Sequence, residues 1–263
     1  MTLSAELVEA RHGRRCVVAP TERDDAFSLE DGYAVGAEVA ELWQEAGHQV
    51  AGIKIGLTNM STWDRLGLSA PVWGPIYRES VLDAAKATPE APVVFPLGPL
   101  AAARIEAEII LELSAELGPG AGPDTIADSI GWAALGFEFV DCHYAGWILR
   151  PPDLVADFCA HAGLVIGARA ALNAAELLAL DSLPVELASE GSLVCTGSGD
   201  RVAGGPLAAV AAVLAAPNAP VVPKGGVIAT GALTGGAHPV GAAQDWHCAP
   251  GLGVLKPVCV RTR

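Results

Sequence analysis

A strict two-residue alternation over residues 104–113 is the feature that most restricts how this chain can fold. Its apolar side chains recur at every second position: Ile105, Ala107, Ile109, Leu111 and Leu113. Because successive side chains of a strand point to opposite faces, this pattern predicts a strand with one face in the core. The other face places Glu106 and Glu108 side by side. Like charges this close repel, so they are tolerated most easily in open water or around a cation.

A third carboxylate, Glu138, lies within a strongly apolar run, residues 132–140. A buried carboxylate needs a partner, because an unpaired charge in an apolar environment is costly. Three carboxylates with room for water or substrate suit a hard divalent ion such as Mg²⁺ or Mn²⁺. The residues alone leave other interpretations open. The pattern favours a solvated strand face for Glu106 and Glu108, and Glu138 could pair with an arginine or cap a backbone group.

Composition excludes some classes of partner. The chain has 263 residues, enough for one large domain or a catalytic domain with a small extra region, and 51% of them are hydrophobic. A formal charge of −14 argues against nucleic acid and anionic membranes as partners. The charged N-terminus indicates no signal peptide, and six scattered cysteines fit a reducing compartment. We therefore expect a cytoplasmic protein.

The first third of the chain predicts an amphipathic helix at 28–47 and a strand at 50–57. In that strand Lys54 shares a face with Gly52 and Gly56. Glycines beside a lysine remove Cβ atoms and make room for a ligand. The alternative is a surface lysine whose stem covers apolar neighbours.

The remaining pattern is mixed α and β. The other expected elements are a short helix at 60–66, a loop at 70–75 leading into a strand at 76–82, a helix from Asp124 to about Leu135 followed by the Glu138 strand, helices at 152–160 and 206–216, and short strands within 193–203, 221–234 and 252–262. This order predicts an α+β chain with two parts. Residues 1–75 form a helical N-terminal region with one strand, packed on a strand-rich catalytic domain over 76–263.

Six short motifs occur in a familiar order along the chain. They are Ser28-Leu-Glu-Asp-Gly-Tyr-Ala-Val35, Gly52-Ile-Lys-Ile-Gly-Leu-Thr58, Arg104-Ile-Glu-Ala-Glu-Ile109, Phe137-Glu-Phe-Val-Asp141, Leu154-Val-Ala-Asp157 and Ile228-Ala-Thr-Gly-Ala-Leu-Thr234. Together they resemble the 2-oxopent-4-enoate (2-hydroxypenta-2,4-dienoate) hydratase and 4-oxalocrotonate decarboxylase branch of the fumarylacetoacetate hydrolase superfamily. Each motif alone is weak, but six in order over roughly residues 25–260 make a specific match.

The resemblance implies a fumarylacetoacetate-hydrolase-like mixed β-roll and a divalent metal, Mg²⁺ or Mn²⁺. Its acidic ligands fall on Glu106, Glu108 and Glu138, the three carboxylates that the residue pattern already distinguishes. The active-site lysine of the family falls on Lys54, and a substrate-facing threonine falls on Thr230. The implied partners are a small 2-oxo acid substrate, other copies of the chain in a homo-oligomer, and a neighbouring pathway enzyme.

Several positions depart from the family pattern. Val72 stands where an acidic residue that contacts the substrate is usual, Phe158 follows Asp157 in place of asparagine, and Gly205 replaces a histidine. These changes leave the three metal carboxylates intact. They therefore affect the identity of the substrate more than the metal.

A further departure follows the third carboxylate, where Cys142 and His143 replace serine and arginine after Asp141. We expect Asp141 to orient the site through hydrogen bonds. A histidine in this context is most often a surface or helix-start residue. The alternative is a catalytic His143 that replaces the lost arginine near the far end of the substrate. Cys142 is expected to pack rather than act as a nucleophile, since no base partner is evident.

Three hypotheses for the function follow. The first is a metal-dependent hydratase of aromatic catabolism that adds water to a 2-hydroxydienoate or 2-oxo-4-enoate and yields a 4-hydroxy-2-oxo acid. The second is a metal-dependent decarboxylase of a 2-oxo-enedioate such as 4-oxalocrotonate, because both reactions pass through a metal-bound dienol. The third is a non-catalytic paralogue that keeps the fold. The altered positions favour it, and the three intact carboxylates oppose it.

Overall fold

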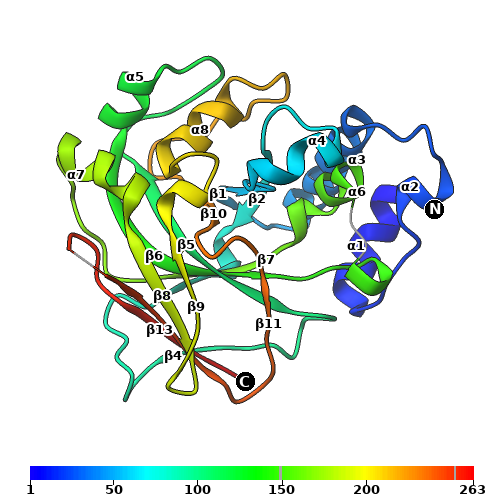
Figure 1. The fold of residues 1–263 in the computed structure, drawn as a ribbon. Helices are drawn as coiled ribbons and strands as arrows, with labels where there is room; N and C mark the ends of the chain where they lie inside the picture. Colours follow the sequence, from blue (N-terminus) through cyan, green and yellow to red (C-terminus); the bar gives the residue numbers. More distant parts are fainter. Residues whose placement is uncertain (148–149, 252) are drawn as a thin grey trace.

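The computed structural model describes residues 1–147, 150–251 and 253–263 of the chain. Within these residues the strands form two sheets (Figure 1). The larger sheet has the order β2 (Val72–Tyr77), β1 (Val50–Gly56), β10 (Val227–Ala232), β5 (Arg104–Leu113), β6 (Ile130–Val140), β7 (His161–Ile166) and β3 (Val81–Asp83), with β11 (His238–Pro239) paired to β5. The smaller sheet has the order β4 (Val93–Phe95), β13 (Val258–Thr262), β12 (Asp245–Pro250), β8 (Pro184–Ser189) and β9 (Ser192–Ser198). The predicted α+β class is confirmed.

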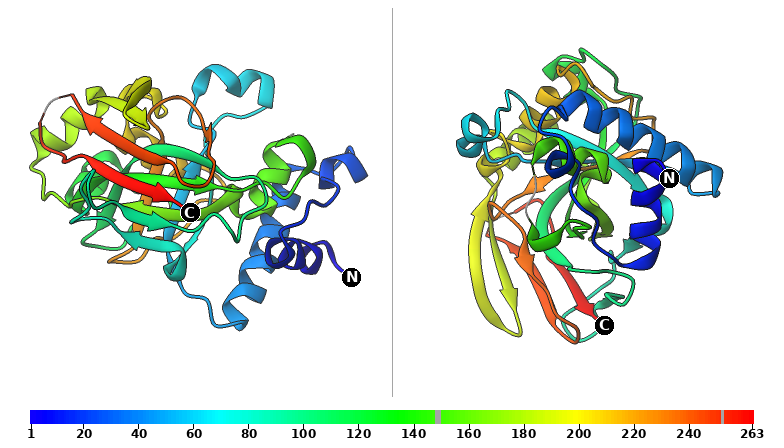
Figure 2. Two further views of the ribbon diagram at one scale, coloured as in Figure 1. Left: turned by 90° about the horizontal axis from the view of Figure 1, so that it is seen from below. Right: turned by 90° about the vertical axis from the view of Figure 1, so that its right-hand side faces the viewer.

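The helices gather in two groups. They are α1 (Leu3–Gly13), α2 (Pro20–Arg23), α3 (Leu29–Glu45), α4 (Trp63–Leu66), α5 (Pro123–Asp128), α6 (Pro151–Ala156), α7 (Ala174–Ala179) and α8 (Pro206–Leu214). Helices α1, α2, α3 and α6 lie together at one end of the molecule (Figure 1 and the left view of Figure 2), α5, α7 and α8 lie beside the sheets at the other, and α4 is outside both groups. Within the described residues, no helix is both long and apolar enough to span a bilayer.

The predicted strand at 104–113 is confirmed as β5, and it forms the centre of the larger sheet. It pairs with β6 in antiparallel register, which places Glu106 directly opposite Glu138. Its alternate side chains are fully buried in the main core, where they meet Phe137 and Phe139 of β6. The alternation therefore fixes both the buried face and the face that carries the carboxylates.

The predicted strand at 50–57 is β1, and its two glycines have packing roles. A Cβ atom on Gly52 would lie 1.8 Å from the carbonyl oxygen of Val227 on the adjacent β10. A Cβ atom on Gly56 would lie 2.6 Å from Sγ of Cys159. Room for a ligand was the expected reason for these glycines. The structure shows instead that they admit neighbouring protein atoms on either side of Lys54.

Two predicted elements are wrong in extent. The helix expected from Asp124 to Leu135 ends at Asp128, because the apolar run that follows is already extended and paired with β5 as β6. The loop expected at 70–75 is largely β2, and the single strand expected at 76–82 is divided by a 3-10 turn at Arg78–Ser80 between the end of β2 and β3. Pro75 obscured this strand in the sequence, yet proline is tolerated there because β2 is at the edge of the sheet.

The helix expected at 28–47 is confirmed as α3. Ser28 is its N-cap, and Asp31 completes a capping box with it. The division of the chain at residue 75 stays a prediction. That residue lies inside β2, and both β1 and β2 are hydrogen-bonded into the larger sheet.

An ion pair fastens the N-terminal helices to the body. Arg11 of α1 lies 2.7 Å from Oδ1 of Asp157 and also donates to the carbonyl oxygen of His161. The second oxygen of Asp157 is 2.7 Å from Nδ1 of His143. Burial alone raises the pKa of Asp157, but Arg11 and His143 hold it below its ordinary value. The carboxylate is therefore ionised and paired at neutral pH.

Replacing Arg11 by methionine should destabilise the protein by about 3–5 kcal/mol, because it leaves a buried carboxylate with one partner fewer. Urea unfolding at pH 7 measures this loss. A lowered carboxyl pKa contributes stability above the ordinary value and loses it as the pH falls through the folded value. The difference between the two proteins should therefore shrink below about pH 4.

Arg15→Met is the matched control, since Arg15 lies just beyond the end of α1 and pairs with Glu9 of that helix, and both side chains are about half exposed, at 51% and 57%. Such pairs contribute little, so we expect no measurable change in the urea midpoint. Equal midpoints for Arg11→Met and wild type would show that the buried pair does not hold the helices in place.

Candidate metal centre and cavity

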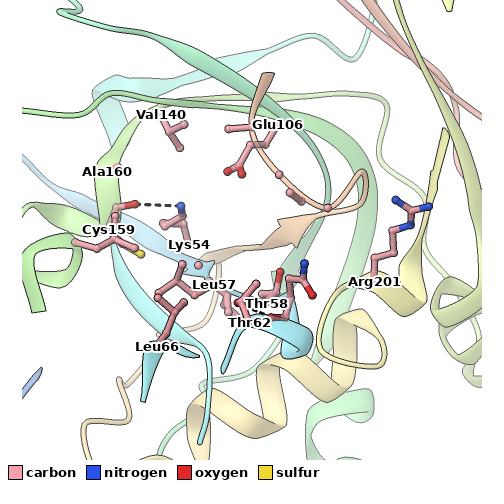
Figure 3. Close-up of a pocket in the computed structure, with 18 of the residues that line it drawn as sticks. Lys54, Leu57, Thr58, Thr62, Leu66, Glu106, Val140, Cys159, Ala160 and Arg201 are labelled. Carbon is pink, nitrogen blue, oxygen red and sulfur yellow. Dashed lines mark hydrogen bonds between the residues drawn. The ribbon is translucent and has the colours of Figure 1, made fainter. Parts of the chain in front are cut away.

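The three carboxylates converge at the centre of the larger sheet. Glu106 and Glu108 come from β5, and Glu138 comes from β6. Each can offer one oxygen such that all three oxygens lie within 4.8 Å of one another. Glu108 and Glu138 are fully buried, while Glu106 is partly exposed on a cavity wall, into which its carboxylate points (Figure 3). The structure therefore brings together the three residues that the sequence predicts as ligands.

Two of the three clustered carboxylates have raised pKa values, and a bound cation would stabilise their ionised forms. Burial, with Glu138 nearby, raises the pKa of Glu106 to about 7. Burial and the two neighbouring carboxylates raise the pKa of Glu108 well above its ordinary value. Burial acts in the same direction on Glu138, but Lys54 and His161 lower its pKa below the ordinary value. Lys54 also acts to lower the pKa of Glu106 and Glu108, but only at Glu138 do the protein's positive and donor groups outweigh burial.

Two fully buried carboxylate oxygens of the cluster have no hydrogen-bond partner among the described residues. Among the described residues, Oε1 of Glu108 and Oε2 of Glu138 are buried without a hydrogen-bond partner. The other oxygen of Glu108 accepts from the backbone N–H of Gly231 at 2.9 Å. Hard oxygen donors that are buried, ionisable and unsatisfied are the ligands that Mg²⁺ and Mn²⁺ prefer. The donor set fits a divalent cation.

Lys54 lies against the cluster. Its Nζ donates to the carbonyl oxygen of Cys159 at 3.1 Å and is 3.2 Å from Oε2 of Glu138. The latter contact is an ion pair, and among the described residues Oε2 has no hydrogen-bond partner. Burial lowers the pKa of Lys54, but the carboxylates, Glu138 foremost, raise it above the ordinary value. The side chain is therefore a fixed cation.

A cavity of about 330 Å³ opens beside Lys54 and Glu106. Part of its wall comes from the end of β1 with the segment that follows, from α4 and from residues 232–237 at and after the end of β10, and part comes from Val140, Trp147, Leu154, Cys159 and Ala160. Two guanidinium groups also line it, those of Arg65 and Arg201. Figure 3 shows Arg201 on the side opposite Lys54 and Cys159. A small anionic molecule that reaches the carboxylates would therefore meet positive charge at both ends.

Three other predicted residues are buried beside the cavity, and none of them is among its described lining residues. Val72 packs in a small apolar cluster with Cys159. Thr230 is fully buried and donates to the carbonyl oxygen of Ile109 at 2.8 Å. His143 is held between Asp157 and Asp141. The expected contacts of Val72 and Thr230 with substrate, and the catalytic role of His143, stay predictions.

Asp141 has the orienting kind of contact that the sequence suggests. Its two oxygens accept from the backbone N–H groups of Ala101 and Ala102, at 2.9 and 2.7 Å. These residues immediately precede β5. Asp141 therefore holds the start of the strand that carries Glu106 and Glu108, while its role in the site stays a prediction. Cys142 is buried, and burial raises the pKa of its thiol to about 12, so it packs as expected.

Sequence reasoning missed His161. Its Nδ1 is 2.9 Å from Oε1 of Glu138, and its Nε2 is 2.9 Å from Oγ of Ser80. The residue falls in none of the six motifs and just beyond the helix expected at 152–160. No local signal could have identified it, because the contact depends on β7, a strand that the pattern did not predict.

The fold is shared with proteins of solved structure. The chain superimposes on 4-oxalocrotonate decarboxylase from Pseudomonas putida G7, complexed with magnesium and adipate, with a TM-score of 0.87 at 24% identity, covering 99% of this chain and 96% of the other. It also matches fumarylpyruvate hydrolase from Pseudomonas aeruginosa, complexed with Mn²⁺ and pyruvate, with a TM-score of 0.59 at 14% identity over 80% of this chain and 92% of the other. The fold is that of the fumarylacetoacetate hydrolase superfamily, as predicted.

Sequence relatives narrow the class. A 2-hydroxypent-2,4-dienoate hydratase of Pseudomonas putida is 30% identical over 211 residues, which are 80% of this chain and 91% of the relative. A 4-oxalocrotonate decarboxylase of Pseudomonas sp. strain CF600 is also 30% identical over 211 residues, 79% of this chain and 76% of the relative. No family model matches the chain. The chain belongs to the family of 2-keto-4-pentenoate hydratases and 4-oxalocrotonate decarboxylases, and the predicted resemblance is confirmed.

Proposed function

We propose that this protein is a metal-dependent hydratase that adds water to a 2-hydroxydienoate or 2-oxo-4-enoate and yields a 4-hydroxy-2-oxo acid. One observation carries the proposal. Buried, unsatisfied oxygens of Glu108 and Glu138 lie with Glu106 beside a cavity that a fixed cation, Lys54, also reaches. Relatives named as hydratases of such acids support it.

Glu106, Glu108 and Glu138 are the residues that would hold the cation, Mg²⁺ or Mn²⁺ in keeping with the ions of the superimposed proteins. When bound, such an ion supplies Lewis-acid polarisation of the 2-oxo group and stabilises negative charge on its oxygen. The protein's own contribution is a dry, rigid set of oxygen donors on two paired strands of the central sheet.

Lys54 stabilises charge that develops on the substrate. Its ammonium is held from two sides, by the Cys159 carbonyl and by Glu138, and so cannot swing away. When the C2 oxygen or the C1 carboxylate gains negative charge, a cation already in place needs no reorganisation. Burial strengthens this interaction, because the surrounding dielectric is low.

A second candidate is decarboxylation of a 2-oxo-enedioate. Arg65 and Arg201 on the cavity wall favour it, because a guanidinium matches the second carboxylate that such a substrate carries. Relatives named 4-oxalocrotonate decarboxylase support this reading as well.

The two reactions are distinguished by their products. With Mg²⁺ present, the purified protein should remove the dienoate absorbance of 2-hydroxypenta-2,4-dienoate and release no CO₂. Release of CO₂ from 4-oxalocrotonate, with no hydration of the dienoate, would establish the second candidate instead. Metal binding without turnover of either substrate would identify a non-catalytic member of the family.

We also infer a homo-oligomer in a reducing, cytoplasmic compartment. All six cysteines are free thiols, which suits such a compartment. Strand β9 is an edge of the smaller sheet and exposes Leu193 and Val194, which suits contact with another copy. Size-exclusion chromatography with light scattering measures the subunit number. Association with a neighbouring pathway enzyme stays a prediction.

A further inference from the structure

The two oxygens of Glu138 have different surroundings. Oε1 is 2.9 Å from Nδ1 of His161. Oε2 faces Lys54 at 3.2 Å and, among the described residues, makes no hydrogen bond. An ionised carboxylate only accepts hydrogen bonds, so Nδ1 of His161 carries the hydrogen in this contact. His161 therefore hydrogen-bonds to one oxygen of the carboxylate, while the other oxygen faces Lys54.

A β-bulge brings His161 to this carboxylate. Along the antiparallel pairing of β6 with β7, Glu138 lies opposite Leu164 and Phe139 lies opposite Gly163. Regular pairing would then place residue 162 opposite Val140, but the register shifts and His161 lies there instead. Directly opposed residues share a face, and Val140 shares its face with Glu138. The extra residue therefore turns the imidazole onto the face of Glu138.

The imidazole is also held from behind. Its Nε2 is 2.9 Å from Oγ of Ser80, which itself lies 2.7 Å from the carbonyl oxygen of Tyr77. Arg11 donates to the backbone carbonyl of His161. The side chain is 2% exposed. The one hydroxyl hydrogen of Ser80 can serve either Nε2 or the Tyr77 carbonyl, so the ring is held chiefly by its Nδ1 contact with Glu138 and by its fixed backbone.

We propose that His161 is a positioning residue for the cation, whose Nδ1–H holds Oε1 of Glu138 and thereby presents Oε2 as the oxygen that the metal receives. The inference rests on the proposed role of Glu138 as a metal ligand. A ligand held by a hydrogen bond from outside keeps its orientation when the metal leaves, so binding costs less ordering. His161 is not among the described residues that line the cavity, and it acts through Glu138.

Two amide substitutions test the proposal. The amide nitrogen of asparagine falls near the position of Nδ1 in histidine, whereas that of glutamine falls near Nε2. His161→Asn should keep the contact with Glu138 and bind Mn²⁺ within about 3-fold of wild type. His161→Gln should keep the contact with Ser80 only and bind about 10–100-fold more weakly. Titration of the metal-free full-length chain, with free Mn²⁺ followed by electron paramagnetic resonance, measures both.

The possible outcomes distinguish failure of the role of His161 from failure of the proposed metal centre. Equal Mn²⁺ affinity of the two variants, whether both tight or both weak, overturns the role of His161. Wild-type protein that binds no Mn²⁺ refutes the metal centre itself. A milder variant, Ser80→Ala, keeps the imidazole but frees its Nε2, and should weaken Mn²⁺ binding by about 3-fold. Unchanged affinity in that variant would also count against the positioning role.

Discussion

Replacing Glu106 by glutamine should lower turnover by about 1,000-fold, since it removes Lewis-acid assistance worth several kcal/mol. Glu106 is partly exposed on the cavity wall, and the amide has nearly the same shape as the carboxylate. The loss should therefore come from charge and coordination rather than from packing. Steady-state kinetics with increasing Mg²⁺ measure it, and the variant should respond weakly or not at all to added metal.

Glu112→Gln is the matched control for this substitution. Glu112 lies on β5 with the same side-chain direction as Glu106, at an even position of the alternation, but outside the carboxylate cluster. Its variant should retain wild-type turnover and metal dependence. Full activity of Glu106→Gln in buffer treated with a chelator would refute the metal role of the cluster.

Replacing Lys54 by methionine should lower kcat by about 100–1,000-fold, the usual cost of removing one pre-positioned group that stabilises developing charge. Methionine keeps most of the buried stem volume, so the local packing on β1 should survive. The substitution also removes a cation 3.2 Å from Oε2 of Glu138. Because Lys54 competes with a metal ion for that oxygen, Mn²⁺ should bind at least as tightly to the variant as to wild type.

A variant of Lys54 should therefore lose turnover and keep its Mn²⁺ affinity, whereas a variant of a metal-binding carboxylate should lose both. Kinetics and Mn²⁺ titration on the same preparation of Lys54→Met give both quantities. Weakened Mn²⁺ binding would mean that Lys54 supports the metal centre, and an unchanged kcat would remove it from the reaction.

The sequence predicts the centre of the site well because its information is local. The alternation around Glu106 and Glu108 defines a strand and a face, and the apolar run around Glu138 defines a second buried strand. Neither pattern contains the register between the strands. The resemblance implies that Glu106 and Glu138 bind the same metal ion. That they lie directly opposite each other on paired strands is seen only in the structure.

The missed features depend on contacts between distant segments. His161 reaches Glu138 through a bulge on a strand that local alternation did not reveal. Val72 and Thr230 occupy motif positions, yet both are buried and neither is among the described residues that line the cavity. The prediction of a helix as far as Leu135 was wrong because small apolar residues suit a buried strand and a helix equally. Only the pairing with β5 decides between the two.

A crystal of this protein soaked with Mn²⁺ gives the most direct test of the metal centre. Anomalous scattering at the manganese edge should show a peak bonded to oxygens of Glu106, Glu108 and Glu138, with Oε2 as the oxygen that Glu138 contributes. Well-diffracting crystals with full Mn²⁺ in the soak and no anomalous peak among these three carboxylates would contradict the account.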